Sequence, residues 1–218
     1  DVRRLSNSLL FEVDEKLQGL EGATEARELI VQRALEYLDG LAGEAGDDSG
    51  LSLELAAAYM KIGDIQGSSR IPNLGHPRDG LVSYEKARGI IDTLLASGAA
   101  DPATRWAQLR VLNGLGVLHQ GLNETERARE YDLAALAVVE TLPDDRTYDY
   151  LLVARVYLSM AINASEDGDP AVLARHAQSV LEVATRWSGA DPSSTEARYW
   201  RGIAQEMRRD PRLVMLGE

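Results

Sequence analysis

Residues 51–62, LSLELAAAYMKI, and residues 111–122, VLNGLGVLHQGL, show the same pattern of side chains. In each stretch a leucine is followed by a small residue and, three positions later, by a ring. A turn containing glycine comes next, and then a second helical pattern. These positions are Leu55, Ala56 and Tyr59 in the first stretch and Leu115, Gly116 and His119 in the second. Repetition of a helix–turn–helix unit is typical of helical repeat proteins, so each stretch is predicted to be the first helix of such a unit.

Packing explains why the pattern recurs. Small residues let two paired helices approach each other closely, and large residues fill the gaps one turn away. A single pair of helices cannot bury its apolar face, so neighbouring pairs must stack. The residues predicted to be buried for this reason are Leu55, Tyr59, Tyr84, Ala87, Leu115, Gly116, Ala128 and Ala135.

The spacing of the leucine position defines the length of the repeat. This position is occupied by Leu9, Leu55, Leu115, Met160 and Ile203, at intervals of 46, 60, 45 and 43 residues. The longest interval contains residues 66–77, whose glycines, serines and prolines predict a loop inserted within a helical pair. The loop also carries the apolar residues Ile71 and Leu74, so we expect it to fold back against the helices. The alternative is a mobile surface loop.

The chain is predicted to be all-α, because no strand-like alternation of apolar and polar residues competes with the helical pattern. Asp-Pro pairs at 101–102, 169–170 and 191–192 mark helix starts. Nine helices are predicted, at about residues 2–19, 24–44, 51–62, 77–97, 102–121, 124–141, 146–166, 170–188 and 193–208. They are expected to form a single domain over residues 1–218, with units at about 1–45, 51–98, 102–141 and 146–188 and a terminal helix at 193–208.

The composition disfavours several classes of protein. The 218 residues hold 35 Asp and Glu against 23 Lys and Arg, a formal net charge of −12, so nucleic acid is an unfavourable partner. Cysteine is absent, which rules out disulfides, thiolate metal sites and cysteine nucleophiles. No apolar run reaches the roughly 18 residues of a membrane span. The chain begins at Asp1 without Met, and we expect it to be part of a longer protein.

Residues 59–87, YMKIGDIQGSSRIPNLGHPRDGLVSYEKA, resemble the tetratricopeptide-repeat (TPR) region of large, membrane-anchored bacterial serine/threonine protein kinases. Residues 1–12, DVRRLSNSLLFE, and 22–41, GATEARELIVQRALEYLDGL, share this resemblance. The inserted loop is its most specific mark. The resemblance implies a right-handed α-solenoid of antiparallel helix pairs.

The resemblance also implies a place in a larger protein. In that family a cytoplasmic kinase domain precedes a single membrane helix, and a region of this kind follows the helix. The chain would then be the extracytoplasmic part of a single-pass membrane protein; the alternative is a cytoplasmic location. The kinase activity does not come with the resemblance, since the glycine-rich phosphate loop, the catalytic HRD and the metal-binding DFG motifs are absent from the sequence.

Residues that carry chemistry form no recognisable catalytic pattern. The three histidines, His76, His119 and His176, lack partners at the spacing of helical metal ligands. Because His119 stands at the ring position of the repeat, we expect it to be packed in the core. The glycines at 40, 43, 46 and 50 are not followed by the Lys and Ser/Thr of a phosphate-binding loop. We therefore expect no catalytic residue, metal or cofactor.

One set of polar residues recurs with the repeat. Arginines stand five positions before four of the apolar residues that define the repeat, at Arg4, Arg110, Arg155 and Arg198. Asn7 and Asn113 follow two of them by three positions, on the same helix face. Arginine binds carboxylates and asparagine binds a peptide backbone, so this face is a candidate ligand groove. The alternative is that these arginines are solvated and pair with nearby glutamates.

These observations predict a non-catalytic module that binds a protein or peptide, with an acidic or carboxylate-terminated ligand in the groove. The alternative function is self-association that brings kinase domains together. The outward positions carry mixed charge rather than an apolar patch, so we expect the isolated chain to be a monomer or at most a weak dimer. These outward residues are Glu36, Glu85, Lys86, Arg88, Glu126, Arg127, Arg129 and Glu130.

Overall fold

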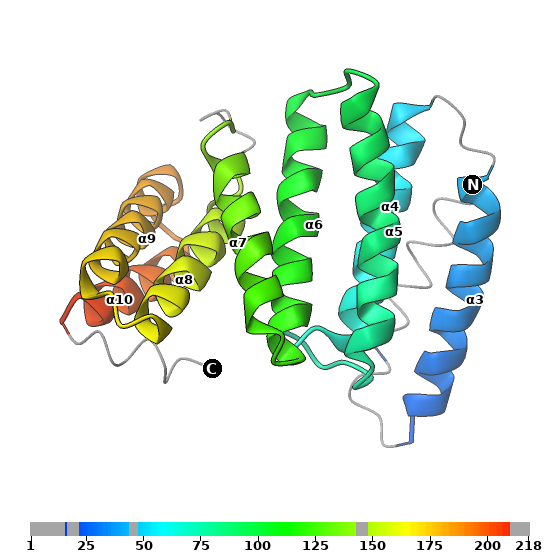
Figure 1. The fold of residues 1–218 in the computed structure, drawn as a ribbon, viewed down its shortest axis with the longest axis horizontal. Helices are drawn as coiled ribbons and strands as arrows, with labels where there is room; N and C mark the ends of the chain where they lie inside the picture. Colours follow the sequence, from blue (N-terminus) through cyan, green and yellow to red (C-terminus); the bar gives the residue numbers. More distant parts are fainter. Residues whose placement is uncertain (1–15, 17–21, 44–47, 143–147, 210–218) are drawn as a thin grey trace. The chain divides into compact units, whose positions relative to one another are not determined.

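A computed structural model of the chain describes residues 16, 22–43, 48–142 and 148–209. Within these ranges the regular structure is entirely helical, which confirms the all-α class (Figure 1). The eight described helices are α3 (Thr24–Ala42), α4 (Ser49–Gly67), α5 (Pro77–Ala96), α6 (Pro102–Gly121), α7 (Thr125–Val139), α8 (Tyr150–Glu166), α9 (Pro170–Ala190) and α10 (Thr195–Arg209). The predicted helix at 2–19 lies, apart from Lys16, outside the described residues.

The chain divides into two compact units, with the boundary between Tyr131 and Asp132 inside α7. The first unit holds α3 to α6 and the first part of α7, with the helices side by side (Figure 1). Helices α4 and α5 pack against each other, and α6 packs against both. The eight residues that were predicted to be buried are all buried. The repeat pattern therefore identified the helix faces that meet.

The helix starts follow from local hydrogen bonds. The side chain of Asp101 accepts from the backbone N–H of Thr104 at 2.9 Å and caps α6, as the Asp-Pro pair predicted. Asp169 caps α9 in the same way. The third Asp-Pro pair, at 191–192, predicted a helix start at about 193, whereas α10 begins at Thr195. There Asp191 holds the preceding turn, and Ser194 accepts from the backbone N–H of Ala197 at 3.1 Å.

Helix α4 is longer than the predicted 51–62, ending at Gly67. Gly63 and Gly67, which would weaken an isolated helix, are sites of close packing here. A Cβ at Gly63 would overlap the ring of Tyr84, and a Cβ at Gly67 would overlap the backbone of Pro77. Ile62 and Ile65 continue the apolar face of the helix and are almost completely buried. Tertiary packing therefore extends α4 past two residues that normally disfavour helices.

The inserted loop is consequently shorter than predicted and spans residues 68–76. It folds back on α4, because Leu74 donates its backbone N–H to Ile65 at 2.8 Å and His76 donates to Gln66 at 2.7 Å. The side chain of Leu74 is half-buried against the core of the first unit. The expectation that this loop folds back against the helices is confirmed.

Side-chain hydrogen bonds also hold the loop in place, one set from within the loop and one from α3. The amide of Asn73 donates to the carbonyls of Ser68 and Ile71 at 2.9 and 3.0 Å and holds the turn between them. From α3, the buried Arg27 donates to the carbonyl of Pro72 at 3.3 Å. The loop is thus fixed to α3 and α4, the two described helices that precede it in the sequence.

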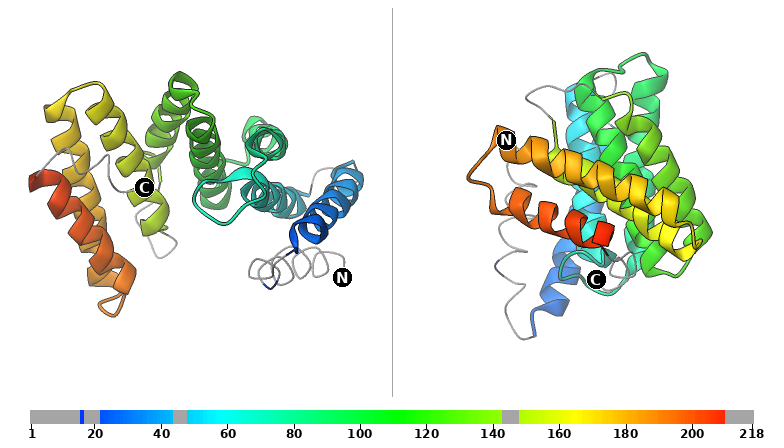
Figure 2. Two further views of the ribbon diagram at one scale, coloured as in Figure 1. Left: turned by 90° about the horizontal axis from the view of Figure 1, so that it is seen from below. Right: turned by 90° about the vertical axis from the view of Figure 1, so that its left-hand side faces the viewer.

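The second unit holds the rest of α7 and the helices α8, α9 and α10. Helices α8 and α9 form an antiparallel pair, and α10 packs against α9 (Figure 2). Its core includes Ala161, Ala164, Leu173, Ala177 and Met207. The packing of helices in pairs is thus repeat-like in both units. None of the helices in the described part of the chain has the length and apolarity of a membrane span.

Candidate functional site

The predicted groove residues lie in different units. Arg110 and Asn113 are on α6 in the first unit, whereas Arg155 on α8 and Arg198 on α10 belong to the second. Arg110 and Arg198 are exposed and Arg155 is half-buried. Arg198 donates to the carbonyl of Ser193, at 3.4 Å, in the turn before its own helix. Asn7, like the arginine at position 4, lies outside the described residues.

Asn113 is not the exposed peptide-binding residue that its helix position suggested. Its side chain is 3% exposed, and its Oδ1 accepts a hydrogen bond of 2.6 Å from Nη1 of Arg70 in the loop. The oxygen assigned to a ligand backbone is therefore used within the chain. Its Nδ2 group is buried and has no hydrogen-bond partner among the described residues.

Arg70 was missed by sequence reasoning as a site residue. It is exposed and lies 43 positions from Asn113 in the sequence. The only signal for it is that it is the one arginine of the inserted loop. Since the loop folds back over α4, it brings Arg70 to the helix that carries Arg110 and Asn113. Arg110 lies one helical turn before Asn113 on α6 and is exposed, whereas Asn113 is buried.

A second candidate site in the first unit is a pocket of about 790 Å³ between α3, α4 and α5. Apolar side chains form part of its wall, at Leu55, Ile90 and Leu94. Hydroxyl groups from α4 and α5 form another part, at Ser49, Ser52, Thr93 and Ser97. Ala42, Gly89 and Ala99 contribute little side-chain volume, which leaves the space open. Pockets with apolar walls and a few polar groups are the usual binding sites for side chains and small molecules.

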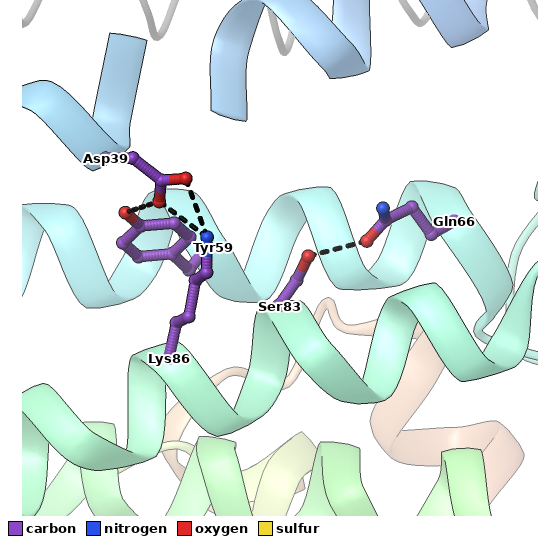
Figure 3. A network of polar contacts seen from close by, with 5 residues as sticks. All are labelled: Asp39, Tyr59, Gln66, Ser83 and Lys86. Carbon is purple, nitrogen blue, oxygen red and sulfur yellow. Dashed lines mark hydrogen bonds and ion pairs between the residues drawn. The ribbon is translucent and has the colours of Figure 1, made fainter. Parts of the chain in front are cut away.

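Two residues that line this pocket, Asp39 and Lys86, form an ion pair (Figure 3). Lys86 on α5 donates to Oδ1 and Oδ2 of Asp39 on α3, at 2.6 and 2.8 Å. Tyr59 on α4 donates its hydroxyl to the same Oδ1 at 2.6 Å. Lys86 also lies over the ring of Tyr59, 5.4 Å from its centroid. Three helices therefore meet at one carboxylate.

The network shifts the pKa values of Asp39 and Tyr59. Hydrogen bonds from Lys86 and then Tyr59 lower the pKa of Asp39, so this carboxylate stays charged at neutral pH. Burial, together with the neighbouring carboxylate of Asp39, raises the pKa of Tyr59 well above its usual value. The site thus holds a fixed cation, a fixed anion and a neutral phenol. Lys86 is exposed, as charge patterning predicted, and it is also an ion-pair partner.

Beside this network, Ser83 on α5 donates to Oε1 of Gln66 on α4 at 2.6 Å (Figure 3). Both side chains are buried. The bond satisfies two polar groups within the interface of α4 and α5, where an unpaired group would be costly. It joins the two helices close to the start of the loop and so supports the placement of residues 68–76.

His119 has the structural role that the sequence predicted. It is buried on α6 and stacks on Tyr131 with ring centroids 5.3 Å apart. Its Nδ1 lies 2.7 Å from Oε2 of Glu124, and this hydrogen bond lowers the pKa of Glu124. Tyr131 donates to Glu85 at 3.0 Å and accepts from Arg88 at 2.8 Å. The histidine is therefore held by packing and a carboxylate.

Across residues 22–43, 48–142 and 148–209, no three side chains among His, Asp and Glu gather in a cluster that could hold a metal ion. Comparison with known proteins does not assign the chain to a family. The chain matches no described protein family, and no curated protein or solved structure is significantly similar to it. Its function is therefore inferred from the residues and contacts described above.

Proposed function

We propose that this chain is a non-catalytic module that binds a protein or peptide segment, built as a right-handed α-solenoid of TPR type. Helix pairs with repeat-like packing support this proposal, as does the resemblance of residues 59–87 to kinase-associated TPR regions. Stacked helical pairs present long surfaces on which an extended or helical segment can lie.

The observation that carries the proposal is the pocket between α3, α4 and α5. Among its described lining residues, apolar side chains form part of the wall and hydroxyls can supply hydrogen bonds, while the two charged ones, Asp39 and Lys86, form an ion pair with each other. Such a pocket favours an uncharged apolar side chain, presented by a protein segment that rests on the surrounding helices. Anchoring of one side chain in a prepared pocket typically supplies much of the affinity of a protein interface.

In the parent protein this module would be the sensory or docking region of a serine/threonine kinase, on the extracytoplasmic side of the membrane. A cytoplasmic position is the alternative. The net charge of −12 argues against a nucleic acid as the partner. Self-association is the second candidate function, and the exposed apolar side chains of Leu29 on α3 and Val82 on α5 favour it.

Gly89 offers a direct test, because it lines the pocket and a Cβ built on it meets no atom within 4 Å. Gly89→Phe should fill the pocket without disturbing the fold. Gly202 on α10 has the same open surroundings, so Gly202→Phe is a matched control. Proteins captured by the wild-type chain would be identified by mass spectrometry, purified and measured by titration calorimetry. We expect Gly89→Phe to weaken binding at least tenfold and Gly202→Phe to leave it unchanged.

Two outcomes would contradict the proposal. The first is that every partner bound by the wild type binds Gly89→Phe equally well. The second concerns self-association, which light scattering measures on the free chain. A stable mass near twice 23.8 kDa at micromolar concentration would favour the alternative function.

A further inference from the structure

The three histidines of the chain differ in whether a carboxylate lies beside the ring. A ring nitrogen of His119 lies 2.7 Å from a carboxylate oxygen of Glu124, and one of the exposed His76 lies 3.3 Å from Glu28. A carboxylate at such a distance compensates the charge of a protonated imidazole. His176 on α9 has no carboxylate partner in the part of the chain that the structure describes. Protonation of His176 would therefore place an uncompensated charge in the second unit.

The ring of His176 is enclosed by packing. The residue is 8% exposed, and its Nδ1 is buried without a hydrogen-bond partner among the described residues. From α8, the ring of Tyr157 lies against it, with ring centroids 6.3 Å apart and planes inclined by 31°. Leu173 and Ala177, which flank His176 on α9, belong to the core of the second unit. The imidazole thus occupies an interface between helices that favours an uncharged ring.

The titratable groups around His176 do not supply the missing negative charge. Helix α9 packs against α8 and α10. Burial lowers the pKa of His176, and the neighbouring cation Arg175 lowers it further. Tyr157 stays neutral, because burial and then the carboxylates of Glu140 and Glu182 raise its pKa. Among the described residues, no charged side chain of α8 or α10 contributes to the shift at His176.

The core of the second unit has little apolar surface with which to offset a buried charge. Three of the five described residues in the core cluster next to His176 are alanines, namely Ala161, Ala164 and Ala177. The core cluster of the first unit is formed mainly by larger side chains, such as Ile62 and Leu115. Because alanine buries little area, the pairing of α8 and α9 has a small hydrophobic contribution to set against the desolvation of an imidazolium.

We infer that His176 is an acid-sensitive switch of the second unit. When its ring takes up a proton in mildly acidic solution, α9 separates from α8 and the apolar faces of both helices become accessible. The first unit stays folded over the same range of pH, because its histidines, His76 and His119, each lie beside a carboxylate. This inference concerns the second unit alone and does not depend on where the proposed module binds its partner.

The direction of the pH dependence follows from the proton balance. Histidine in an unfolded chain has a pKa of about 6.5. Because the pKa of His176 is lower in the folded chain, the open form binds the proton more readily, and α8 and α9 open more easily as the pH falls below about 6.5. One proton raises the equilibrium constant for opening by at most about tenfold per pH unit. The increase ends once the pH lies below the lowered pKa of His176.

Hydrogen–deuterium exchange of the full chain, followed by mass spectrometry and converted to protection factors, tests the inference. Between pH 7 and pH 5 the protection of α8 and α9 should fall by about threefold or more, whereas that of α4, α5 and α6 should change by less than about twofold. His176→Gln cannot take up a proton, so it should remove the pH dependence of α8 and α9. His76→Gln makes the same change at an exposed position in the first unit and should keep the response of the wild type.

A titration of the wild type followed by NMR gives a second readout that does not require the variant to fold. The ring Cε1–H signal of His176 should titrate with a midpoint below about 6.5. The inference is overturned if this midpoint is at or above 6.5, or if α8 and α9 keep constant protection from pH 7 to pH 5. It is also overturned if α4, α5 and α6 lose as much protection as α8 and α9, or if a folded His176→Gln responds to pH as the wild type does.

Discussion

The ring of Tyr84 on α5 lies so close to Gly114 on α6 that a Cβ built on Gly114 would overlap it. The same ring packs against Gly63 of α4, and its hydroxyl donates to Asp64 at 2.8 Å. One side chain therefore determines the spacing of three helices. Glycine at these two positions serves close packing, since Gly63 and Gly114 both lie inside helices with ordinary helical conformations.

The first prediction compares two glycine-to-alanine changes. Gly114→Ala should destabilise the protein by about 1–3 kcal/mol, because overpacking against Tyr84 outweighs the better helix propensity of alanine. Gly89→Ala, in open space near the middle of α5, should stabilise it by up to about 1 kcal/mol. Urea unfolding followed by circular dichroism measures both. Equal effects of the two changes would show that the contact with Tyr84 does not limit this position.

The second prediction concerns the inserted loop. Leu74→Ala should cost about 1–2 kcal/mol, less than a fully buried leucine, because Leu74 is only half-buried. Ser69→Ala, at an exposed loop position, should change stability by less than about 0.5 kcal/mol. The backbone amides of Leu74 and His76 should exchange slowly with deuterium, since both are hydrogen-bonded to α4. Rapid exchange throughout 68–76 would contradict the folded-back loop.

The third prediction concerns alkaline pH. The pKa values of Tyr59, Tyr84, Tyr131 and Tyr157 are raised, chiefly by burial. In the unfolded chain tyrosine ionises near pH 10. Since the folded chain keeps these protons, their contribution to stability is complete below about pH 10 and falls as the pH rises further. Absorbance at 295 nm should therefore show these four tyrosines ionising together with the loss of helix measured by circular dichroism.

Tyr84→Phe tests this assignment. The variant has one fewer buried phenol, so its stability should fall less steeply above pH 10 than that of the wild type. Complete ionisation of the tyrosines near pH 10 with unchanged helix content would contradict the prediction.

The fourth prediction concerns the carboxylate shared by α3, α4 and α5. Lys86 and Tyr59 lower the pKa of Asp39. The ion pair of Asp39 and Lys86 therefore stabilises the fold at pH values above the ordinary pKa of Asp, about 3.9. This contribution is lost as the pH falls through the lowered pKa of Asp39. Lys86→Gln should raise the pKa of Asp39, as measured by carboxyl ¹³C shifts. Because both side chains are partly exposed, it should cost less than about 1 kcal/mol at neutral pH.

The outcome expected at low pH distinguishes this ion pair from simple packing. The difference in stability between wild type and Lys86→Gln should shrink as the pH falls through the lowered pKa of Asp39, because the carboxylate then becomes protonated in both proteins. A constant difference from pH 7 to pH 2 would show that the aliphatic part of Lys86 stabilises the fold, rather than its charge.

The sequence by itself determined the fold class, most helix positions and the main buried residues. These features depend on signals within one or two helical turns, such as the cap at Asp101 and the alternation of small and large residues around Leu55 and Leu115. The same reasoning placed His119 in the core, because it occupies the ring position of the repeat. Local periodicity and capping are read directly from neighbouring residues, and tertiary packing did not override them there.

Only the tertiary structure decided how far α4 extends and which polar side chains meet. Gly63 and Gly67 read as breaks in a helix, yet the contacts with Tyr84 and Pro77 make glycine suitable at both positions. Asp39 and Lys86 are separated by 47 positions, as Arg70 and Asn113 are by 43. A long, flexible side chain has many partners within its reach, and the helix spacing and loop path select among them. That selection comes from packing across the whole first unit and leaves no pattern in the local sequence.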